Sequence, residues 1–336
     1  MKKLHELFGI NPTKGDVGIE IECEGANLQP VMGNGWRTED DNSLRGEYPH
    51  SRCEWVFTKP LSLTDALASL EYLEDVQKKG KAKFNFSFRT SVHVHVNVQK
   101  LTVDEILNMC YTYFLCERVL MNYCAPHRRG NRFCLRMEDA EGLMATIIKL
   151  TKAEEYQWPA LNPHDRIRYS ALNLEALWKY GSLEFRGLEG NMDVQRIHKW
   201  ATAFVNIREF AKKFANVQEI HDLYVKNRPD TFFKMAVGDV YRVFEYEDYV
   251  NDLRRGFSLT IDIPYAYRAK EEEVKGVIKT KAMFDPMVFV GDAAQVGQIA
   301  AIREEVMQAN RWAVPPQQLN RAPRPAPQNR PVRPQF

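Results

Sequence analysis

The sequence predicts an α+β fold in which helices pack on one face of an antiparallel sheet and leave the other face open. Three short segments, residues 18–24, 92–98 and 183–186, alternate apolar with polar residues. Side chains of a strand point to opposite faces with period two, so each segment has an apolar back and a polar front. A parallel doubly wound sheet would instead show continuous apolar runs. The segments between these strands repeat apolar residues at helical spacing.

The first part of the chain predicts three strands and two helices. The strands are expected at residues 17–24, 54–57 and 92–98, with a Gly-, Asn- and Asp-rich loop at 25–47. Pro60 stops the second strand, and Ser62 with Asp65 is typical of a helix start. Thr102 with Glu105 predicts a capping box that opens a long apolar-striped helix.

The remaining elements are more helical. We expect a helix at 138–150, strands at 168–174 and 182–187, and a helix that Asp193 caps. Beyond residue 217 the patterns are helical, with a break at 227–230 and a short strand at 258–263.

The composition predicts three regions. A chain of 336 residues is long enough for one large domain or two ordinary ones. We expect residues 1–255 to form a catalytic domain and 256–312 a mixed C-terminal extension. Residues 313–336 contain seven prolines, four arginines and no acid. Such a tail cannot bury enough apolar surface to fold, so we expect it to be disordered.

The overall charge does not indicate a charged partner such as a membrane surface or nucleic acid. There are 46 basic and 44 acidic residues, a net charge of +2. This near balance gives no argument for a membrane surface, and none for nucleic acid except through the basic tail. The six cysteines form no CxxC pair and sit inside apolar patterns, which predicts buried free thiols in a reducing compartment.

The N-terminus predicts a cytoplasmic protein. It begins with Lys2 and Lys3, but the apolar stretch of a signal peptide does not follow. No run of apolar residues is long enough to span a bilayer.

The first polar front carries Glu20 and Glu22. Two residues apart on a strand, their carboxylates point the same way, roughly 7 Å apart at the backbone. Carboxylate oxygens are ligands for hard divalent cations. The same pattern also suits the exposed polar face of an edge strand, so this motif alone leaves both interpretations open.

The second front carries His93 and His95, whose imidazoles can bind a metal or hydrogen-bond a phosphate. Zinc hydrolases with a His-x-His pattern need a following Asp and His, and Asn97 and Val98 stand there instead. The Glu that a cupin-like site needs is also missing. A zinc or non-haem iron site is therefore disfavoured.

The third front pairs Glu184 with Arg186. This is either a neutralising ion pair or a metal ligand beside a phosphate clamp, because a guanidinium offers a planar fork of donors. The sequence has no Walker pattern and no GxGxxG after a strand. If the site handles nucleotide phosphates, it does so through metals and side chains.

Six motifs in order resemble one family, the amidoligases, which are carboxylate–amine ligases related to glutamine synthetase and glutamate–cysteine ligase. Members are common in bacteria and their phages. The resemblance covers about residues 15–215. Its motifs are Gly18-Ile19-Glu20-Ile21-Glu22, Asp41-Asn42-Ser43-Leu44, Cys53-Glu54-Trp55-Val56, Ser91-Val92-His93-Val94-His95-Val96, Arg168-Tyr169 with Asn173, and Leu183-Glu184-Phe185-Arg186-Gly187.

The resemblance implies a glutamine-synthetase-like curved antiparallel sheet with helices on its convex side. It implies that ATP, with Mg²⁺, phosphorylates a substrate carboxylate, and that an amine then attacks the acyl phosphate to leave an amide. The substrates would be small-molecule or peptide carboxylates and amines. It also implies that the chain could be phage-encoded and act in a host cytoplasm, and relatives of this fold often assemble into oligomers.

The resemblance also implies roles for individual residues. Arg186 and Glu54 would take part in catalysis, Arg186 by stabilising the phosphoryl group in flight and Glu54 as a further metal carboxylate. His95 would face nucleotide phosphate. The roles of Arg168 and Asn173 do not follow from the resemblance, but both lie near a matched strand, and we expect them to touch substrate or phosphate. The metal ligands would be Glu20, Glu22, Glu54, His93 and Glu184.

Some interpretations stay open at this stage. The basic segment 127–132 either closes over ATP or an acidic substrate, or is a solvated loop. The site could instead belong to a two-metal phosphohydrolase that uses the same carboxylates and histidines. The chain could also be a non-catalytic binding protein with a decayed site, although every charged position on the three fronts is intact.

Overall fold

The computed structural model describes residues 1–140, 142–161 and 167–274. The predicted tail at 313–336 lies outside these residues, as does much of the predicted extension at 256–312. The domain boundaries therefore stay predictions.

The described strands form one sheet, and every strand pair in it is antiparallel. Its order is β2-β3-β1-β5-β7-β6, and β4 pairs with β1 off this path. The strands are β1 (Val17–Ala26), β2 (Trp36–Glu39), β3 (Arg52–Phe57), β4 (Lys83–Phe84), β5 (Ser91–Asn97), β6 (Leu172–Asn173) and β7 (Ser182–Glu189).

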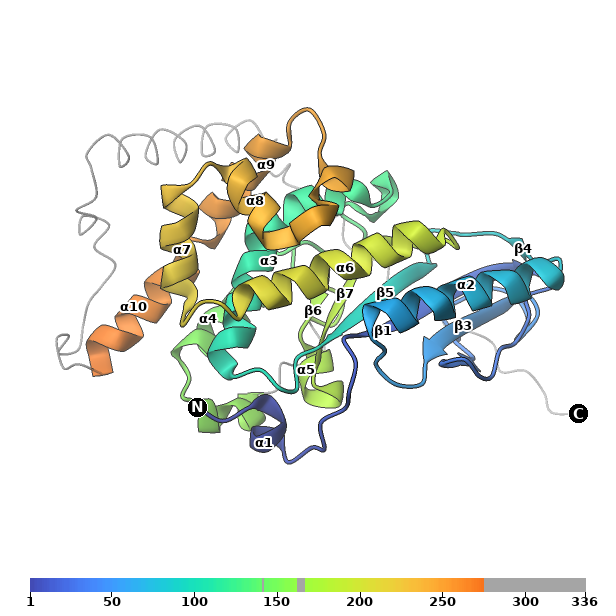
Figure 1. Cartoon of the computed structure of the whole chain (residues 1–336), viewed down its shortest axis with the longest axis horizontal. Helices are drawn as coiled ribbons and strands as arrows, with labels where there is room; N and C mark the ends of the chain where they lie inside the picture. The colour runs from blue at the N-terminus through green and yellow to red at the C-terminus, as the bar shows by residue number, and fades with distance from the viewer. Residues whose placement is uncertain (141, 162–166, 275–336) are drawn as a thin grey trace, which may run out of the picture. The chain divides into compact units, whose positions relative to one another are not determined.

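Helices cover one face of this sheet, which confirms the predicted α+β class (Figure 1). The long helices α2, α3 and α6 bury their apolar faces against the apolar backs of the strands. The helices are α1 (Leu4–Phe8), α2 (Leu63–Lys79), α3 (Val103–Tyr123), α4 (Leu143–Lys152), α5 (Glu175–Tyr180), α6 (Val194–Ala211), α7 (Val217–Lys226), α8 (Pro229–Val237), α9 (Tyr249–Thr260) and α10 (Asp262–Val274), with short 3₁₀ helices η1 (Pro126–Arg128), η2 (Glu155–Leu161) and η4 (Gly238–Phe244).

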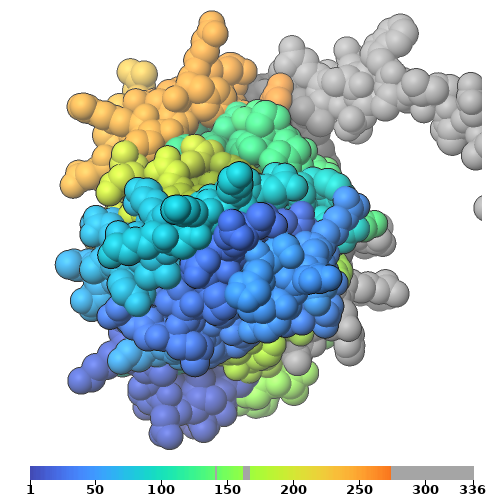
Figure 2. Space-filling model, turned by 90° about the vertical axis from the view of Figure 1, so that its right-hand side faces the viewer, coloured from blue at the N-terminus to red at the C-terminus, as the bar shows by residue number. Residues whose placement is uncertain are grey.

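Figure 2 shows the side of the molecule that lies at the right in Figure 1. Residues of the first three strands and α2, drawn in blue, cover the middle of this side. The later helices, drawn in orange, lie at the top of this view, with a band of residues drawn in cyan and green between them and the blue ones. None of the helices among the described residues is both long and apolar enough to cross a membrane.

Three predicted helix starts are confirmed. The Ser62 hydroxyl accepts the Asp65 amide at the start of α2, and the Asp193 carboxylate accepts the Arg196 amide at the start of α6. Thr102 and Glu105 form a reciprocal capping box at the start of α3. These side chains satisfy amides that the first helical turn leaves without partners.

The register of the sheet brings the three polar fronts together. Glu20 on β1 lies opposite His93 on β5, and Glu22 lies opposite Glu54 on β3. His95 in turn lies opposite Glu184 on β7. Directly opposed side chains on one face are about 5 Å apart at Cβ, so the pairing itself assembles the site.

The register between β5 and β7 shifts near His93. Val92 pairs with Leu188 and Val94 pairs with Phe185, so two residues of β7 oppose the single residue His93. This is a β-bulge, which lets Phe185 and Leu188 both face the core although they are three residues apart. The strict alternation predicted for this strand therefore ends at Arg186.

The strand predicted at 258–263 is wrong. In the structure α9 continues to Thr260 and α10 begins at Asp262. The Thr260 hydroxyl donates to the Gly256 carbonyl at 3.0 Å, and Leu253, Gly256 and Thr260 are buried at helical spacing. A six-residue alternation is too short to distinguish a strand from an amphipathic helix.

Three other expectations are corrected in extent. The predicted loop at 25–47 contains the edge strand β2, and the predicted strand at 168–174 shrinks to β6. The helix predicted at 138–150 begins only at Leu143. Boundaries of this kind depend on tertiary pairing, which local pattern does not show.

The contact between α3 and α9 predicts a sensitive position. A Cβ placed at Gly256 would lie 2.5 Å from the Leu115 carbonyl oxygen. We therefore expect Gly256→Ala to lower the free energy of unfolding by about 1–3 kcal/mol, the usual cost of overpacking. Chemical denaturation would measure this. The exposed neighbour Ser258→Ala is the control, and an equal loss in both variants would contradict the close packing of the two helices.

Candidate active site

A cavity of about 460 Å³ opens on the face of the sheet that the long helices leave free. Strands β1, β3, β5, β6 and β7 all contribute side chains to its wall. Every residue that the sequence predicted for the site lines this one cavity: Glu20, Glu22, Glu54, His93, His95, Arg168, Asn173, Glu184 and Arg186.

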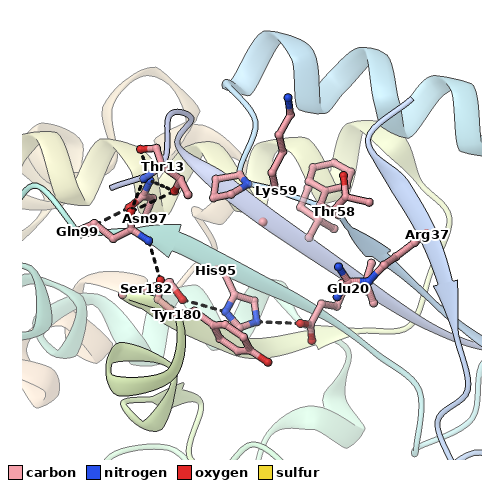
Figure 3. Close-up of a pocket in the computed structure, with 16 residues that line it drawn as sticks. Thr13, Glu20, Arg37, Thr58, Lys59, His95, Asn97, Gln99, Tyr180 and Ser182 are labelled. Atoms are coloured by element: carbon pink, nitrogen blue, oxygen red, sulfur yellow. Dashed lines mark hydrogen bonds and ion pairs between the residues drawn. The ribbon is translucent and has the colours of Figure 1, made fainter. Parts of the chain in front are cut away.

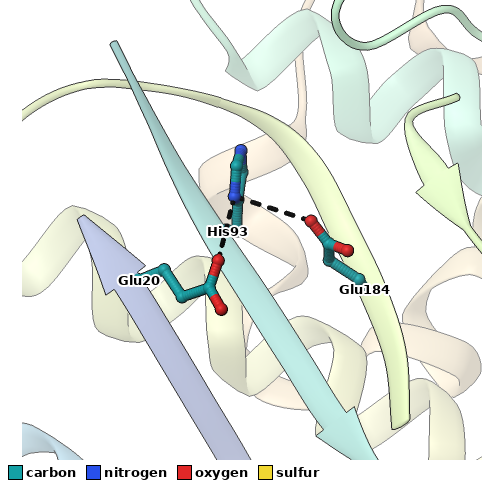
Figure 4. Close-up of side chains that lie close together, drawn as sticks. All are labelled: Glu20, His93 and Glu184. Atoms are coloured by element: carbon teal, nitrogen blue, oxygen red, sulfur yellow. Dashed lines mark hydrogen bonds and ion pairs between the residues drawn. The ribbon is translucent and has the colours of Figure 1, made fainter. Parts of the chain in front are cut away.

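The buried imidazole of His93 lies at the centre of the site, with acidic side chains at both ring nitrogens. Its Nδ1 is 3.2 Å from Glu20 Oε2 and 3.5 Å from Glu184 Oε1 (Figure 4). Its Nε2 is 2.8 Å from Ser91 Oγ and 3.9 Å from Glu22 Oε1. Strand β5 is flanked by β1 and β7, so a carboxylate reaches the ring from each neighbour.

The hydrogen bonds of Ser91 assign the protons of this ring. The single Ser91 hydroxyl proton is donated to Glu22 Oε2 at 2.5 Å. Ser91 Oγ can then only accept from His93 Nε2, so Nε2 carries a proton. Glu20 is a carboxylate that only accepts, so Nδ1 donates to Glu20 Oε2 in this arrangement. With a cation bound between Glu20 and Glu184, Nδ1 would instead offer its lone pair to that cation.

Two groups of side chains could hold a metal ion. Glu20, His93 and Glu184 form one, and Glu22, Glu54 and His93 form the other; in each group the ligand atoms lie within 4.8 Å of one another. The Nδ1 lone pair of His93 fits the first group. Since Nε2 carries a proton, the second group is left with its two carboxylates. Oxygen-rich sets of this kind suit hard divalent cations.

The electrostatics of the second group favour a cation. Burial, and then the charges of Glu20 and Glu22, raise the pKa of Glu54 to about 9. The Glu54 carboxylate has no hydrogen bond or ion pair within the described ranges. A carboxylate crowded by other carboxylates and without a donor is a group that a divalent cation would stabilise.

In the first group, the negative charges of Glu20 and Glu184 are already balanced by nearby positive side chains. Burial alone would raise the pKa of Glu20, but His95 and His93 hold it well below its usual range. Burial would also raise the pKa of Glu184, yet Arg186 and the two histidines lower it. The pKa of His95 is raised against the effect of burial by Glu20 and Glu184.

Arg186 and Asn173 both contact Glu184. The Arg186 guanidinium pairs with Glu184 Oε1 and donates through Nε to the Phe133 carbonyl at 3.3 Å. Asn173 Nδ2 donates to Glu184 Oε2 at 2.6 Å. The structure thus places Asn173 as a support of Glu184. Arg168 is exposed at the cavity wall, with its guanidinium 5.2 Å from the Tyr169 ring.

A second cavity of about 260 Å³ adjoins the first at His95. Figure 3 draws the residues that line this second cavity. The two cavities share five lining residues, Glu20, Arg37, Val56, His95 and Tyr180. Most of the exposed lining surface of the second cavity is apolar, although polar residues such as Thr58, Asn97 and Gln99 also line it. His95 connects the two, with Nε2 3.2 Å from Glu20 Oε1 and Nδ1 3.1 Å from Ser182 Oγ.

The first cavity, of about 460 Å³, is called the acidic cavity below because carboxylates line it. Several of its lining residues were not predicted from the sequence, among them Arg37, Glu39, Arg89, Lys179 and Tyr180. The alternation of Arg37 and Glu39 on β2 was a readable signal of a polar front. Lys179 and Tyr180 come from α5, whose six residues are too few for a periodic pattern. Ser91 was part of a quoted motif, but its bonding became visible only in the structure.

The structure corrects both interpretations of the basic segment 127–132 at one residue, Arg128. Arg128 is fully buried, and its guanidinium donates to the backbone carbonyls of Arg186 and Gly187. It therefore belongs neither to a solvated loop nor to a surface that closes over a ligand. The six cysteines are all free and buried, as predicted.

Comparisons with known proteins give one family and distant structural likenesses. No curated protein matches this chain. A solved structure that it resembles is the "Crystal structure of a bifunctional glutathione synthetase from Pasteurella multocida", with 11% identity and a TM-score of 0.35. That likeness covers 81% of this chain and 50% of the other, so the chain spans half the length of the structure it matches.

A family model described as "Putative amidoligase enzyme" matches residues 32–207. The matched segment contains β3, β5 and β7, and thus Glu54, His93 and Glu184, whereas Glu20 and Glu22 on β1 precede it. Since the match covers just over half of the 336 residues, the chain belongs to the amidoligase family.

Proposed function

We propose that this protein is an ATP-dependent carboxylate–amine ligase that works through an acyl-phosphate intermediate. One observation carries the proposal. In this chain of the amidoligase family, two pairs of carboxylates lie around the imidazole of His93, and the Arg186 guanidinium contacts one of these carboxylates, Glu184. The glutamine-synthetase-like architecture and the cytoplasmic setting implied by the resemblance are parts of the same proposal. The substrates would be small-molecule or peptide carboxylates and amines.

The donor sets fit divalent cations, which we propose to be Mg²⁺. Glu20, His93 Nδ1 and Glu184 would hold one ion, and Glu22 with Glu54 would hold a second. When bound, the ions would neutralise nucleotide phosphates that otherwise repel a substrate carboxylate. The raised pKa of Glu54 and its lack of a partner in the described part of the chain are what support the second ion.

We place the nucleotide base in the second cavity, whose exposed lining surface is mainly apolar. Its shared wall at His95 puts it beside the acidic cavity, so one elongated ligand could reach both. A nucleotide has the required two ends, a flat apolar base and a polyanionic chain. The His95 imidazole, whose pKa is raised by Glu20 and Glu184, would donate to a phosphate oxygen at the junction.

In the proposed reaction a substrate carboxylate oxygen attacks the γ-phosphorus of ATP, and the bond to the bridging oxygen breaks to release ADP. The nitrogen of the amine then attacks the acyl carbon. The carbon–oxygen bond to phosphate breaks, inorganic phosphate leaves, and the amine gives up a proton. Arg186 would donate to the oxygens of the phosphoryl group during its transfer, a fixed charge that costs no reorganisation.

The proposal predicts ADP release that depends on two substrates. Purified protein with Mg²⁺ and ATP would be tested against a panel of amino acids and peptides, singly and in pairs. We expect ADP release only with a carboxylate–amine pair, together with a condensation product seen by mass spectrometry. Glu20→Gln should abolish it, and loss of Arg186 should lower kcat by about 10²–10³-fold, the scale for removing one preorganised charge stabiliser.

The two alternatives give different results in the same assay. ATP breakdown without an acceptor would contradict the ligase and favour the phosphohydrolase. No binding of nucleotide or metal, measured by calorimetry, would contradict both enzymes and favour a binding protein.

The pKa of Glu54 predicts how stability depends on pH without metal. Folding raises this pKa from 4.5 to about 9. Between these values the folded state holds a proton that the unfolded state releases, so Glu54 makes the free energy of unfolding fall as pH rises. Glu54→Gln should reduce this fall between pH 5.5 and 8.5, measured by urea denaturation in EDTA.

The exposed Glu247→Gln is the matched control and should keep the wild-type slope. Adding Mg²⁺ at pH 8.5 should stabilise the wild type more than Glu54→Gln. An unchanged slope in Glu54→Gln would show that Glu54 is not held in the crowded, unpartnered state described above.

A further inference from the structure

Arg128 is a buried cation whose contacts do not explain its charge. It is 0% exposed, and it forms no ion pair with a carboxylate in the described residues. Its Nη1 is buried without a hydrogen-bond partner. Taking a guanidinium out of water without a counter-ion costs free energy, so a well-packed apolar side chain would serve stability better.

The two hydrogen bonds that the Arg128 guanidinium does form go to one place, the bulge in β7. Nη2 donates to the Arg186 carbonyl at 2.6 Å, and Nε donates to the Gly187 carbonyl at 3.3 Å. These are the two residues that together oppose His93. A bulge interrupts the regular ladder, and carbonyls at this point need donors from elsewhere. A planar fork is suited to two neighbouring acceptors.

The bulge itself sets the direction of Arg186. Phe185 before it and Leu188 after it are both buried in the core, so the two residues between them must fill one position of the pleat. A Cβ at Gly187 would lie 2.5 Å from Met121 Sδ, so this residue sits tightly against α3. The Arg186 amide donates to the Ala171 carbonyl at 2.9 Å, and its side chain turns to Glu184.

The segment that carries Arg128 also contacts the Arg186 side chain. The Arg128 carbonyl accepts from the Asn131 amide at 3.3 Å and from Cys134 Sγ at 3.2 Å. Phe133, which lies between these residues, offers its carbonyl to Arg186 Nε. Arg128 thus holds the backbone of Arg186 directly and, through its own loop, the acceptor of the Arg186 side chain.

We propose that Arg128 is a positioning residue, which fixes the bulge of β7 and thereby aims the Arg186 guanidinium into the acidic cavity. The consequence for turnover rests on the ligase function proposed above. The consequence for the conformation of β7 does not, so the two can be tested separately.

The test for turnover is a double-mutant cycle of Arg128→Met and Arg186→Met in the ADP-release assay. We expect Arg128→Met to lower kcat by about tenfold or more while KM for ATP changes far less, because a misaimed group costs rate. The double variant should be no slower than Arg186→Met alone. Losses that multiply would show that Arg128 acts independently of Arg186 and would overturn the proposal.

Arg118→Met is the matched control. Arg118 lies on α3 and pairs with Asp252 and Glu138, away from the lining of either cavity. Its loss removes a partly buried arginine from the helical layer without touching the bulge, so its kcat should stay near that of the wild type. If Arg128→Met does not fold, Arg128→Lys replaces it. Lysine keeps the charge but presents a single nitrogen, so kcat should fall, and the loss should vanish in the Arg186→Met background.

The test for conformation is amide hydrogen exchange of the full-length chain without ligands. In Arg128→Met or Arg128→Lys the peptide spanning residues 182–190 should exchange several-fold faster, while α2 at 63–79 keeps its wild-type rate. An unchanged rate at 182–190 would overturn the proposal. If the wild type shows no ligase turnover, the proposed function fails, and the exchange rates still decide the role of Arg128.

Discussion

The contact of the His93 imidazole with acidic side chains at both ring nitrogens is the interaction on which the rest of the site depends. A buried ring in this position needs its neighbours at fixed places, and the sheet provides them, because β1 and β7 flank β5. Ser91 then determines the proton on Nε2. Nδ1, which donates to Glu20, is thereby the ring nitrogen that could bind a cation in place of its proton. A side chain two residues away thereby decides which carboxylates can share a cation with the ring.

The helical layer makes this arrangement possible by burying the backs of the same strands. Val92, Val94 and Val96 are fully buried against the helices, so a slip of one residue would move the histidines into the core. The charges then divide the cavity into two parts. Glu20 and Glu184 are balanced by imidazoles and Arg186, whereas Glu54 is balanced by nothing in the residues that the structure describes. The proposed cations would restore that balance.

Much of this site could be predicted from the sequence, because the period-two pattern alone assigns each polar residue to a face. The alternation placed Glu20, His93 and Glu184 on fronts, and the structure brings them into one cavity. What the pattern could not show is which residue faces which, since register depends on pairing between segments far apart in the chain. The proton on His93 and the role of Asn173 depend on hydrogen bonds that no spacing shows.

The expectations that were wrong also depended on contacts between segments far apart in the chain. The bulge at Arg186 and Gly187 breaks the alternation because Phe185 and Leu188 both reach the core. Arg128 sits in a run of basic residues, and charge normally indicates exposure, so its burial beneath the bulge could not be expected from composition. The alternation at 258–263 fitted a helix equally well, and packing of α9 against α3 decided between the two.

In the proposed site, His93 would use Nδ1 to hold a divalent cation together with Glu20 and Glu184. This arrangement is tested most directly by a crystal structure with Mn²⁺ in place of Mg²⁺ and a non-hydrolysable ATP analogue, in which anomalous scattering locates the metal. We expect an ion bound by His93 Nδ1, Glu20 and Glu184, and a second ion between Glu22 and Glu54. An ion bound to Nε2, or no ion in the acidic cavity, would contradict it.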